Sequence, residues 1–378
     1  MSCPMMHRLS ATLTATWKPA RLGLPAVIRY FTPNWFAATM GTGILSIALS
    51  QFPEMPLAWQ VGKYLWLFNI ALFSLCYLLF CARWFRHFDE AKQLLHHPVM
   101  SMFFGCIPMG LATIVNGFMI FGLPGIGEVA IDIAHALWWL DVGLSLACGL
   151  IVPYAMFTRQ SHSMEQMTAV WLLPLVASEV AAVSGGLLIP HIADPAMQMT
   201  ILMLCLLLWS LSVPIALGIL VILFVRLALH KLPEATMAAS CWLSLGPIGT
   251  GALALLVFSD VSPAVLSSNG LAAVAAAFSG AALLGGVLLW GYGLWWFSLA
   301  AAFTARYIKR GMPFNLGWWG FTFPLGVFSV ATLRLGHAFS FPPIAVLGAI
   351  LVTALGLIWC IVAFNTMRGL QKGAFFKA

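Results

Sequence analysis

Charged residues are scarce in this sequence: Asp, Glu, Lys and Arg make up 8% of the 378 residues, whereas hydrophobic residues make up 62%. A soluble domain contains about 25% charged and about 45–50% apolar residues. The scarcity of charge therefore excludes a soluble globular protein, a disordered chain and a disulfide-stapled secreted domain. The composition is that of a polytopic membrane protein. A bilayer-spanning helix needs about 20 residues, so the chain has room for about ten of them.

Close cysteine pairs and clustered metal ligands are also lacking. The eight cysteines are scattered and none forms a Cys-x-x-Cys pair, which favours buried thiols over disulfides or metal sites. His96 and His97 are adjacent, but they have no further ligands nearby and are expected in a loop. There is no nucleotide motif, and only Glu179 and Asp141 lie at mid-membrane depth, in different apolar runs. We therefore expect no cofactor, no metal, no catalytic residues and no enzymatic activity.

Ten apolar runs, bounded by charge, Pro or polar clusters, predict an all-α polytopic membrane protein. The runs are 33–52, 60–83, 102–122, 129–157, 170–189, 197–227, 236–258, 270–305, 317–338 and 342–367. They are uniformly apolar, so alternating β-barrel strands are excluded. The expected organisation is an N-terminal tail (1–30), a ten-helix transmembrane pore domain (31–368) and a C-terminal tail (369–378).

Basic residues are distributed unequally between the two sides of these runs. Sixteen of the 18 Lys and Arg residues lie in the tails or in the loops after the second, fourth, sixth and eighth runs. This bias predicts that both termini are cytoplasmic in a plasma or inner membrane, and the N-terminal tail does not read as a signal peptide. The net charge of +7 is explained by topology and contact with anionic lipid, without a nucleic-acid partner.

The five odd-numbered runs share a Pro or Gly at a repeated position. The third, seventh and ninth runs share an eight-residue pattern in which an aromatic residue comes first, Pro is sixth and Gly is eighth. The three sequences are FFGCIPMG, WLSLGPIG and WGFTFPLG. The first run has Gly in place of Pro, and the fifth lacks the aromatic residue and the final Gly. The repeated positions, 67, 66, 73 and 77 residues apart, are Gly41, Pro108, Pro174, Pro247 and Pro324. This spacing indicates a repeat of one helical hairpin, more than the general frequency of Pro and Gly in membrane helices explains.

A Pro in the middle of a helix kinks the axis and frees a carbonyl, which is tolerated in a membrane where protein or water satisfies it. We therefore expect the repeated positions, together with Gly326, to be kinks in pore-lining helices. The odd-numbered runs also contain clusters of small residues, whereas the even-numbered runs are rich in Leu. The pattern predicts an inner ring of odd-numbered helices around a pore and an outer, lipid-facing ring. The 16 Trp residues are expected mostly at lipid-facing or interfacial positions.

Four segments of the chain resemble the tellurite-resistance/dicarboxylate transporter family, which includes bacterial tellurite-resistance proteins, plant slow-type anion channels, fungal malate permeases and fungal sulfite efflux pumps. The segments are FTPNWFAATMGTGILS (31–46), HPVMSMFFGCIPMGLATIVN (97–116), WLLPLVAS (171–178) and WWGFTFPLG (318–326). The second segment is most similar to the sulfite pumps.

The resemblance implies five helical hairpins in a quasi-five-fold arrangement around a central pore, in a homotrimer with one pore per protomer. It implies transport of a small anion: sulfite or a dicarboxylate such as malate, with tellurite, nitrate and chloride as further candidates. It also implies that Phe323 is the pore gate, with Phe321 as the nearby alternative.

Ionisable residues within the runs are costly in a membrane and are therefore candidates for function. Arg334 is the only cation well inside an odd-numbered run, where it could attract anions or form a salt bridge to an outer acid such as Asp132; His337 could assist it or lie at the interface. Glu179 could exchange protons during transport or tie helices together. Asp141 is expected to be a buried partner of a hydroxyl, a Trp N–H or a cation.

Three classes of function remain open from these residues. A channel and a proton-coupled carrier for small anions both agree with the pattern. A membrane-embedded enzyme would need a catalytic cluster that is not visible in the sequence. A receptor or scaffold would not need five kinked inner helices.

Overall fold

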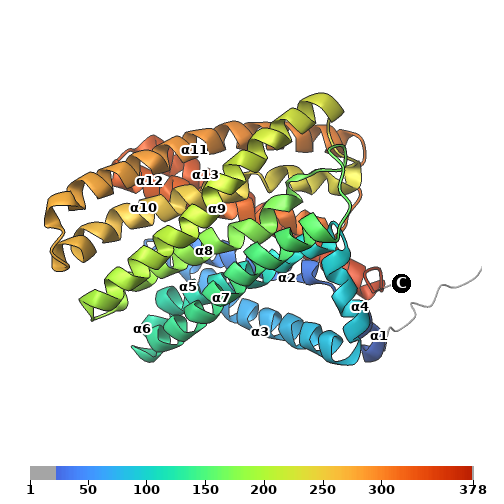
Figure 1. Cartoon of the computed structure of the whole chain (residues 1–378), viewed down its shortest axis with the longest axis horizontal. Helices are drawn as coiled ribbons and strands as arrows, with labels where there is room; N and C mark the ends of the chain where they lie inside the picture. The colour runs from blue at the N-terminus through green and yellow to red at the C-terminus, as the bar shows by residue number, and fades with distance from the viewer. Residues whose placement is uncertain (1–22, 377–378) are drawn as a thin grey trace, which may run out of the picture.

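The computed structural model describes residues 23–376, and that part of the chain is a bundle of helices without a β-strand (Figure 1). Nine helical stretches in it are long and apolar enough to cross a bilayer. The all-α, multi-pass membrane architecture predicted from composition is confirmed. Residues 1–22 of the expected N-terminal tail and residues 377–378 lie outside the described residues, and α1 (Leu24–Tyr30) forms the end of the N-terminal tail.

Five inner segments, each a short 3₁₀ helix followed by an α-helix, occupy the centre of the bundle. They are η1 (Pro33–Trp35) with α2 (Phe36–Leu49); η3 (Met100–Gly105) with α5 (Cys106–Gly117); η5 (Ala169–Leu172) with α8 (Leu173–Leu188); η7 (Ala235–Trp242) with α10 (Leu245–Ser268); and η8 (Leu316–Phe321) with α12 (Thr322–Ala338). A π-turn, η4 (Phe118–Gly122), extends α5, and η6 (Ile189–His191) extends α8. In the most apolar stretch of each of the four longer segments, 83–94% of the residues are buried.

Five long outer helices surround this centre. In the most apolar stretch of each outer helix, only 17–33% of the residues are buried. They are α3 (Pro56–Arg86), α7 (Val129–Thr158), α9 (Pro195–His230), α11 (Ala272–Lys309) and α13 (Pro342–Gln371). The short α4 (Phe88–Gln93), η2 (Leu94–His96) and α6 (Leu123–Ile126) lie in the connections. The difference in burial matches the predicted division into inner odd-numbered and outer even-numbered helices, because Leu-rich surfaces are stable against lipid.

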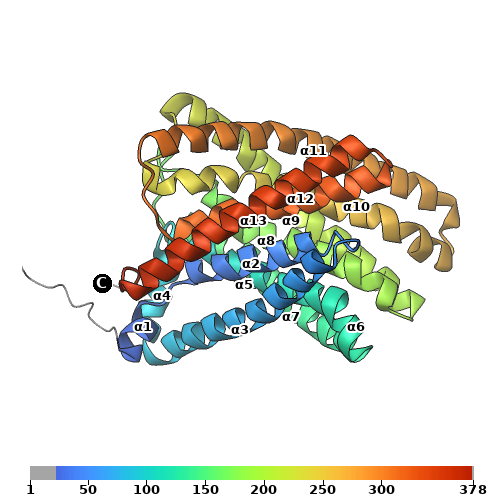
Figure 2. The ribbon, with the colours of Figure 1, turned by 180° about the vertical axis from the view of Figure 1, so that it is seen from behind.

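All five inner helices run in the same direction along the bundle, and the outer helices return (Figures 1 and 2). We call the end with α1, α4 and the C-terminus the basic end, because it carries most of the Lys and Arg residues. The opposite end, which carries Glu54, Glu128 and Asp194 in its turns, is the acidic end.

The first predicted run, 33–52, contains an α-helix of only 14 residues. At 1.5 Å per residue, α2 covers about 21 Å of a hydrocarbon layer that is about 30 Å thick. A short helix is tolerated there because α2 is enclosed by protein and does not have to shield its ends from lipid. A total of ten crossing helices therefore stays a prediction.

The inner helices contact one another in a closed ring, in the order α2, α5, α8, α10, α12 and back to α2. A glycine lies at each of the five contacts, where an added Cβ would press against the neighbouring helix. The pairs are Gly43 with Thr113, Gly105 with Leu173, Gly186 with Val257, Gly249 with Phe328 and Gly326 with Ile44. Three of these glycines belong to the sequence repeat. The repeat therefore preserves close helix approach around the ring.

Each outer helix donates a Trp N–H to the inner helix of the next hairpin. The bonds are Trp66 to Ile114 O (3.2 Å), Trp138 to Ala181 O (2.9 Å), Trp209 to Gly251 O (3.1 Å), Trp290 to Thr332 Oγ1 (3.0 Å) and Trp359 to Thr42 Oγ1 (3.1 Å). The last bond connects the final helix with the first one. These five Trp residues are thus inward-facing hydrogen-bond donors, and the expectation of lipid-facing or interfacial positions is wrong for them.

The repeated prolines are not mid-helix kinks. Pro174 is the second residue of α8, and the third residues of α5, α10 and α12 are Pro108, Pro247 and Pro324. Each lies in the first turn after a 3₁₀ segment, where the missing N–H costs nothing because it has no partner within the helix. Gly41 is the sixth residue of α2. The repeat therefore marks a change from 3₁₀ to α geometry inside the bundle.

Candidate functional site

Two cavities lie inside the ring of inner helices, one toward each end, and all five inner segments contribute to both. The acidic-end cavity has a volume of about 180 Å³, and its polar lining residues are Gln51, Thr113, Asn116, His191, Thr250 and Arg334. The basic-end cavity has a volume of about 240 Å³, and its polar lining residues are Asn34, Thr236, Ser240 and Asn315. The two cavities follow the axis of the bundle. Gly41, Gly326 and the repeated prolines are not among the described lining residues of either cavity, and their place along a pore stays a prediction.

Phe323 lies between the two cavities. It shares one face of α12 with Val327, Val330 and Arg334, because residues 323, 327, 330 and 334 recur at helical spacing. All four line the acidic-end cavity, and Phe323 is the one nearest the basic end. Gly320, three residues earlier, already lines the basic-end cavity. The ring of Phe323, whose side chain is almost fully buried, is therefore the floor of the acidic-end cavity.

Phe321 has a different environment. Its ring packs edge-on against Trp242 and Trp318, with centroids 5.8 Å and 5.7 Å away. It lines neither cavity in the described part of the chain. Of the two phenylalanines expected as gate candidates, only Phe323 lines one of these cavities, and Phe321 packs against two Trp rings.

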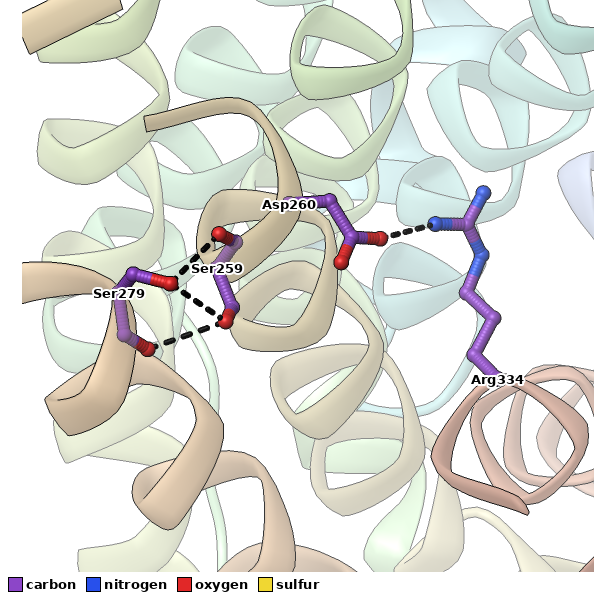
Figure 3. A network of polar contacts seen from close by, with 4 residues as sticks. All are labelled: Ser259, Asp260, Ser279 and Arg334. Atoms are coloured by element: carbon purple, nitrogen blue, oxygen red, sulfur yellow. Dashed lines mark hydrogen bonds and ion pairs between the residues drawn. The ribbon is translucent and has the colours of Figure 1, made fainter. Parts of the chain in front are cut away.

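Arg334 lies at the mouth of the acidic-end cavity and forms an ion pair with Asp260 of α10 (Figure 3). Its Nη1 donates to Asp260 Oδ2 at 3.2 Å. The sequence left open a salt bridge to an outer acid; such a bridge is present, and its partner is Asp260 and not Asp132, the acid named as the example. Asp132 belongs to the outer helix α7, whereas α10 packs directly beside α12 in the ring.

The residue before Asp260 fixes α10 to its outer neighbour. Ser259 Oγ donates to Ser279 O at 3.0 Å, and Ser279 Oγ donates to Ser259 O at 2.8 Å (Figure 3). These reciprocal bonds join α10 to α11 on the side away from Arg334. They hold the backbone from which the Asp260 carboxylate extends toward α12.

Two uncharged polar residues of the acidic-end cavity each have a buried oxygen without a partner among residues 23–376. Several hydroxyls of the inner helices bond to their own helix, as Ser329 does with Leu325 O at 2.6 Å. The buried Thr250 hydroxyl and the Asn116 amide oxygen have no partner among the described residues. Sequence reasoning missed both, together with Gln51 and His191. Uncharged side chains in an apolar run do not differ visibly from packing residues.

The two buried carboxylates lie away from the passage. Glu179 is fully buried on α8, and its Oε2 accepts a bond from Ser212 of α9 at 3.2 Å. Asp141 is fully buried on α7, and neither of its oxygens has a partner among the described residues, so the expected partner is absent there. Neither residue lines a cavity, and His337 is exposed at the end of α12 without lining one. No group of three or more potential metal ligands comes together within residues 23–376.

Two cavities enclosed by a ring of parallel helices, inside a shell of apolar outer helices, are typical of a membrane transport protein. Residues 30–367 match the voltage-dependent anion channel family, and the chain belongs to this family. The resemblance to tellurite-resistance/dicarboxylate transporters is thereby confirmed.

Curated relatives span nearly the whole chain. The sulfite efflux pumps of Arthroderma benhamiae and Trichophyton rubrum are each 36% identical over 354 residues, which cover 92% of this chain and 93% of the relative. The malic acid transport protein of Schizosaccharomyces pombe is 22% identical over 359 residues, which cover 93% of this chain and 81% of the relative. The family and these relatives indicate transport of anions across a membrane.

Proposed function

We propose that the protein conducts small oxyanions through the axial passage, that sulfite is its principal substrate and that Phe323 is the gate. The observation that carries this proposal is the pair of cavities enclosed by the same five inner segments, with Phe323 as the residue of α12 that lines the acidic-end cavity nearest the basic end. Transport needs only a continuous route with favourable contacts, and no chemical conversion is proposed.

The choice of sulfite rests on the relatives and on the size of the passage. The relatives named sulfite efflux pumps are 36% identical to this chain, whereas the one named malic acid transport protein is 22% identical. A cavity of about 180 Å³ accommodates a compact oxyanion with part of its water shell. Malate, tellurite, nitrate and chloride are the competing substrates of the test below.

The proposed gate acts by volume and by solvation. A phenyl ring in a narrow lumen fills the space, and it offers no replacement for the water that an anion loses on entry. Opening then requires a rotamer change of Phe323 or a small shift of α12. The contact between Gly326 and Ile44 brings α12 close to α2 directly beside the ring.

A channel is favoured over a proton-coupled carrier. Glu179, the candidate proton carrier, faces Ser212 of an outer helix and does not line the passage. The side chain therefore serves as a tie between α8 and α9 in this proposal.

The proposed assembly is the one that the family resemblance implies, and the outer surface supports it. The outer helices expose large apolar side chains such as Leu78, Phe157 and Leu288, which suit lipid and contacts between protomers. We propose a homotrimer with one passage per protomer. The basic end is proposed to face the cytoplasm of a plasma or inner membrane, because positively charged loops are retained on that side.

The test is uptake of labelled sulfite and labelled malate by proteoliposomes containing the purified protein. Sulfite flux that exceeds malate flux and needs no pH gradient supports the proposal. Preference for malate would reassign the substrate, and a strict requirement for a pH gradient would favour a carrier. Equal background flux in protein-free and protein-containing liposomes would contradict transport of either anion.

A further inference from the structure

We propose that Arg334 is a two-pronged oxyanion-binding site at the mouth of the acidic-end cavity, and that Asp260 is a built-in counter-charge that keeps this site weak enough to release its ligand. The inference rests on the proposed anion pathway and deepens it. It names the residue that binds the anion before or after the gate and the residue that sets its affinity.

Only one nitrogen of the Arg334 guanidinium donates a hydrogen bond to the described residues. Nη1 donates to Asp260 Oδ2 at 3.2 Å, and Arg334 makes no other side-chain hydrogen bond with the described residues. In Figure 3, Nη1 points toward Asp260 and the opposite side of the guanidinium points away from it. The fork of Nε and Nη2 matches two oxygens of a carboxylate or a sulfite, which is the usual geometry of strong arginine–oxyanion pairs.

Arg334 is also the only Lys or Arg on the described walls of either cavity. The Arg334 side chain is 28% exposed and lines the acidic-end cavity, so part of it is accessible to an anion there. An anion that moves along the passage therefore meets one cation, and it meets this cation at the acidic end.

Asp260 has the same chemistry as the ligand. Its carboxylate is an oxyanion, it is tethered beside the cation, and its side chain is 63% exposed. The reciprocal bonds between Ser259 and Ser279 fix the backbone next to it. A passing anion and Asp260 share one guanidinium, so the local charge is close to zero before the anion binds. A conducting site must attract an anion and also release it, and a bare arginine in a partly dry cavity would hold an oxyanion too long.

The decisive experiment measures the sulfite concentration that gives half-maximal flux in proteoliposomes. Asp260→Asn keeps an amide oxygen that accepts the Nη1 hydrogen bond but removes the negative charge. We expect the half-saturating concentration to fall about tenfold, with a maximal rate that is equal or lower. Arg334→Lys keeps the positive charge but loses the fork. We expect the half-saturating concentration for sulfite to rise about tenfold, with a smaller change for chloride, which cannot use two prongs.

Lys63→Gln is the matched control. Lys63 is the other basic residue near the acidic end, but it lies on the outer helix α3 over the ring of Trp59. Its removal changes the charge by one unit, as Asp260→Asn does with the opposite sign, at a residue that lines neither cavity. We expect no change in the half-saturating concentration at physiological ionic strength.

Several outcomes overturn the inference. If Asp260→Asn leaves the half-saturating concentration unchanged or raises it, Asp260 is not a counter-charge. If Arg334→Lys behaves as wild type, Arg334 acts as a general charge and not as a fork. If the wild-type protein moves no anion, the proposed function fails, and sulfite titration of the detergent-purified variants by calorimetry then decides the inference. Tighter binding by Asp260→Asn than by wild type would support it in that case, and equal or weaker binding would end it. Thermal unfolding of each variant confirms that it is folded.

Discussion

The two cavities have the same five walls but different chemistry. The acidic-end cavity has a cation, a histidine, two amides and two hydroxyls on its lining, whereas the basic-end cavity is mainly apolar with a few amides and hydroxyls. The direction of the inner helices explains the difference. Because all five run from the basic end to the acidic end, the partly negative C-terminal ends of α2, α5, α8 and α12 lie near the acidic-end cavity, whereas α10 continues well past it. An anion is disfavoured there unless side chains such as Arg334 compensate.

The basic-end cavity needs less compensation. The N-terminal segments of the same helices point their unpaired N–H groups toward this end, and these groups carry partial positive charge. An apolar wall there does not repel an anion. The comparison indicates that side chains along a pore offset the electrostatic potential of the helix backbone. If so, changes at the acidic-end cavity should affect transport more than changes elsewhere.

The ring that separates the two cavities should be the most sensitive position. Phe323→Ala removes the floor of the acidic-end cavity and joins the two spaces. We expect sulfite flux several-fold or more above wild type at equal protein amount, measured in proteoliposomes. A Phe323→Ala variant that is less stable and no leakier would show that the ring serves packing only.

Phe321→Ala is the counterpart that lies outside both cavities. Loss of its contacts with Trp242 and Trp318 should lower the free energy of unfolding by about 3–5 kcal/mol, as truncation of a buried Phe does. Flux per folded protein should stay at the wild-type level. Unfolding in detergent and flux measured on the same sample check the prediction, and a leaky Phe321→Ala would exchange the roles of the two rings.

The unpartnered hydroxyl of the acidic-end cavity can be compared with a hydroxyl on the other side of the gate. Thr250→Val should raise the half-saturating sulfite concentration about tenfold or more, because a hydrogen bond to a charged group is lost. Thr236→Val in the basic-end cavity should have a smaller effect. The same flux titration measures both, and equal effects would show that the two cavities do not differ in anion recognition.

Glu179→Gln should have the smallest effect. The amide keeps an acceptor for the Ser212 hydroxyl, and the side chain lies outside the passage. We expect the same dependence of flux on pH as in wild type, measured between pH 5 and 8. A changed pH profile would show that Glu179 exchanges protons during transport and would favour a carrier.

The helices of this fold were predictable from the sequence because the bilayer imposes a simple rule on composition. The predicted run 129–157 corresponds to α7 (Val129–Thr158), and 342–367 corresponds to α13 (Pro342–Gln371). The inner and outer sets were also predictable, since small residues favour helix contact and Leu favours lipid.

The details of the site were less accessible to sequence reasoning. A proline in the first turn of an α-helix and a proline in its middle look alike within an apolar run, so the 3₁₀ segments before Pro108 and Pro324 were missed. The partner of Arg334 depends on which helices are neighbours in the ring, and Asp260 is 74 positions away in the chain. Thr250 differs from other threonines only in the absence of a partner, which is a property of three-dimensional structure.

The bond from Trp359 to Thr42 has a consequence for how the protein is made. It joins residues 317 positions apart, and α2 meets α12 and α13 only after the last hairpin has entered the membrane. Chains emerge from the ribosome N-terminus first, and contacts of long sequence separation are costly to close. The wall of the passage therefore stays open on one side throughout synthesis. A chain that stops before the last hairpin has no enclosed route for ions, so an unfinished protein cannot leak along this axis.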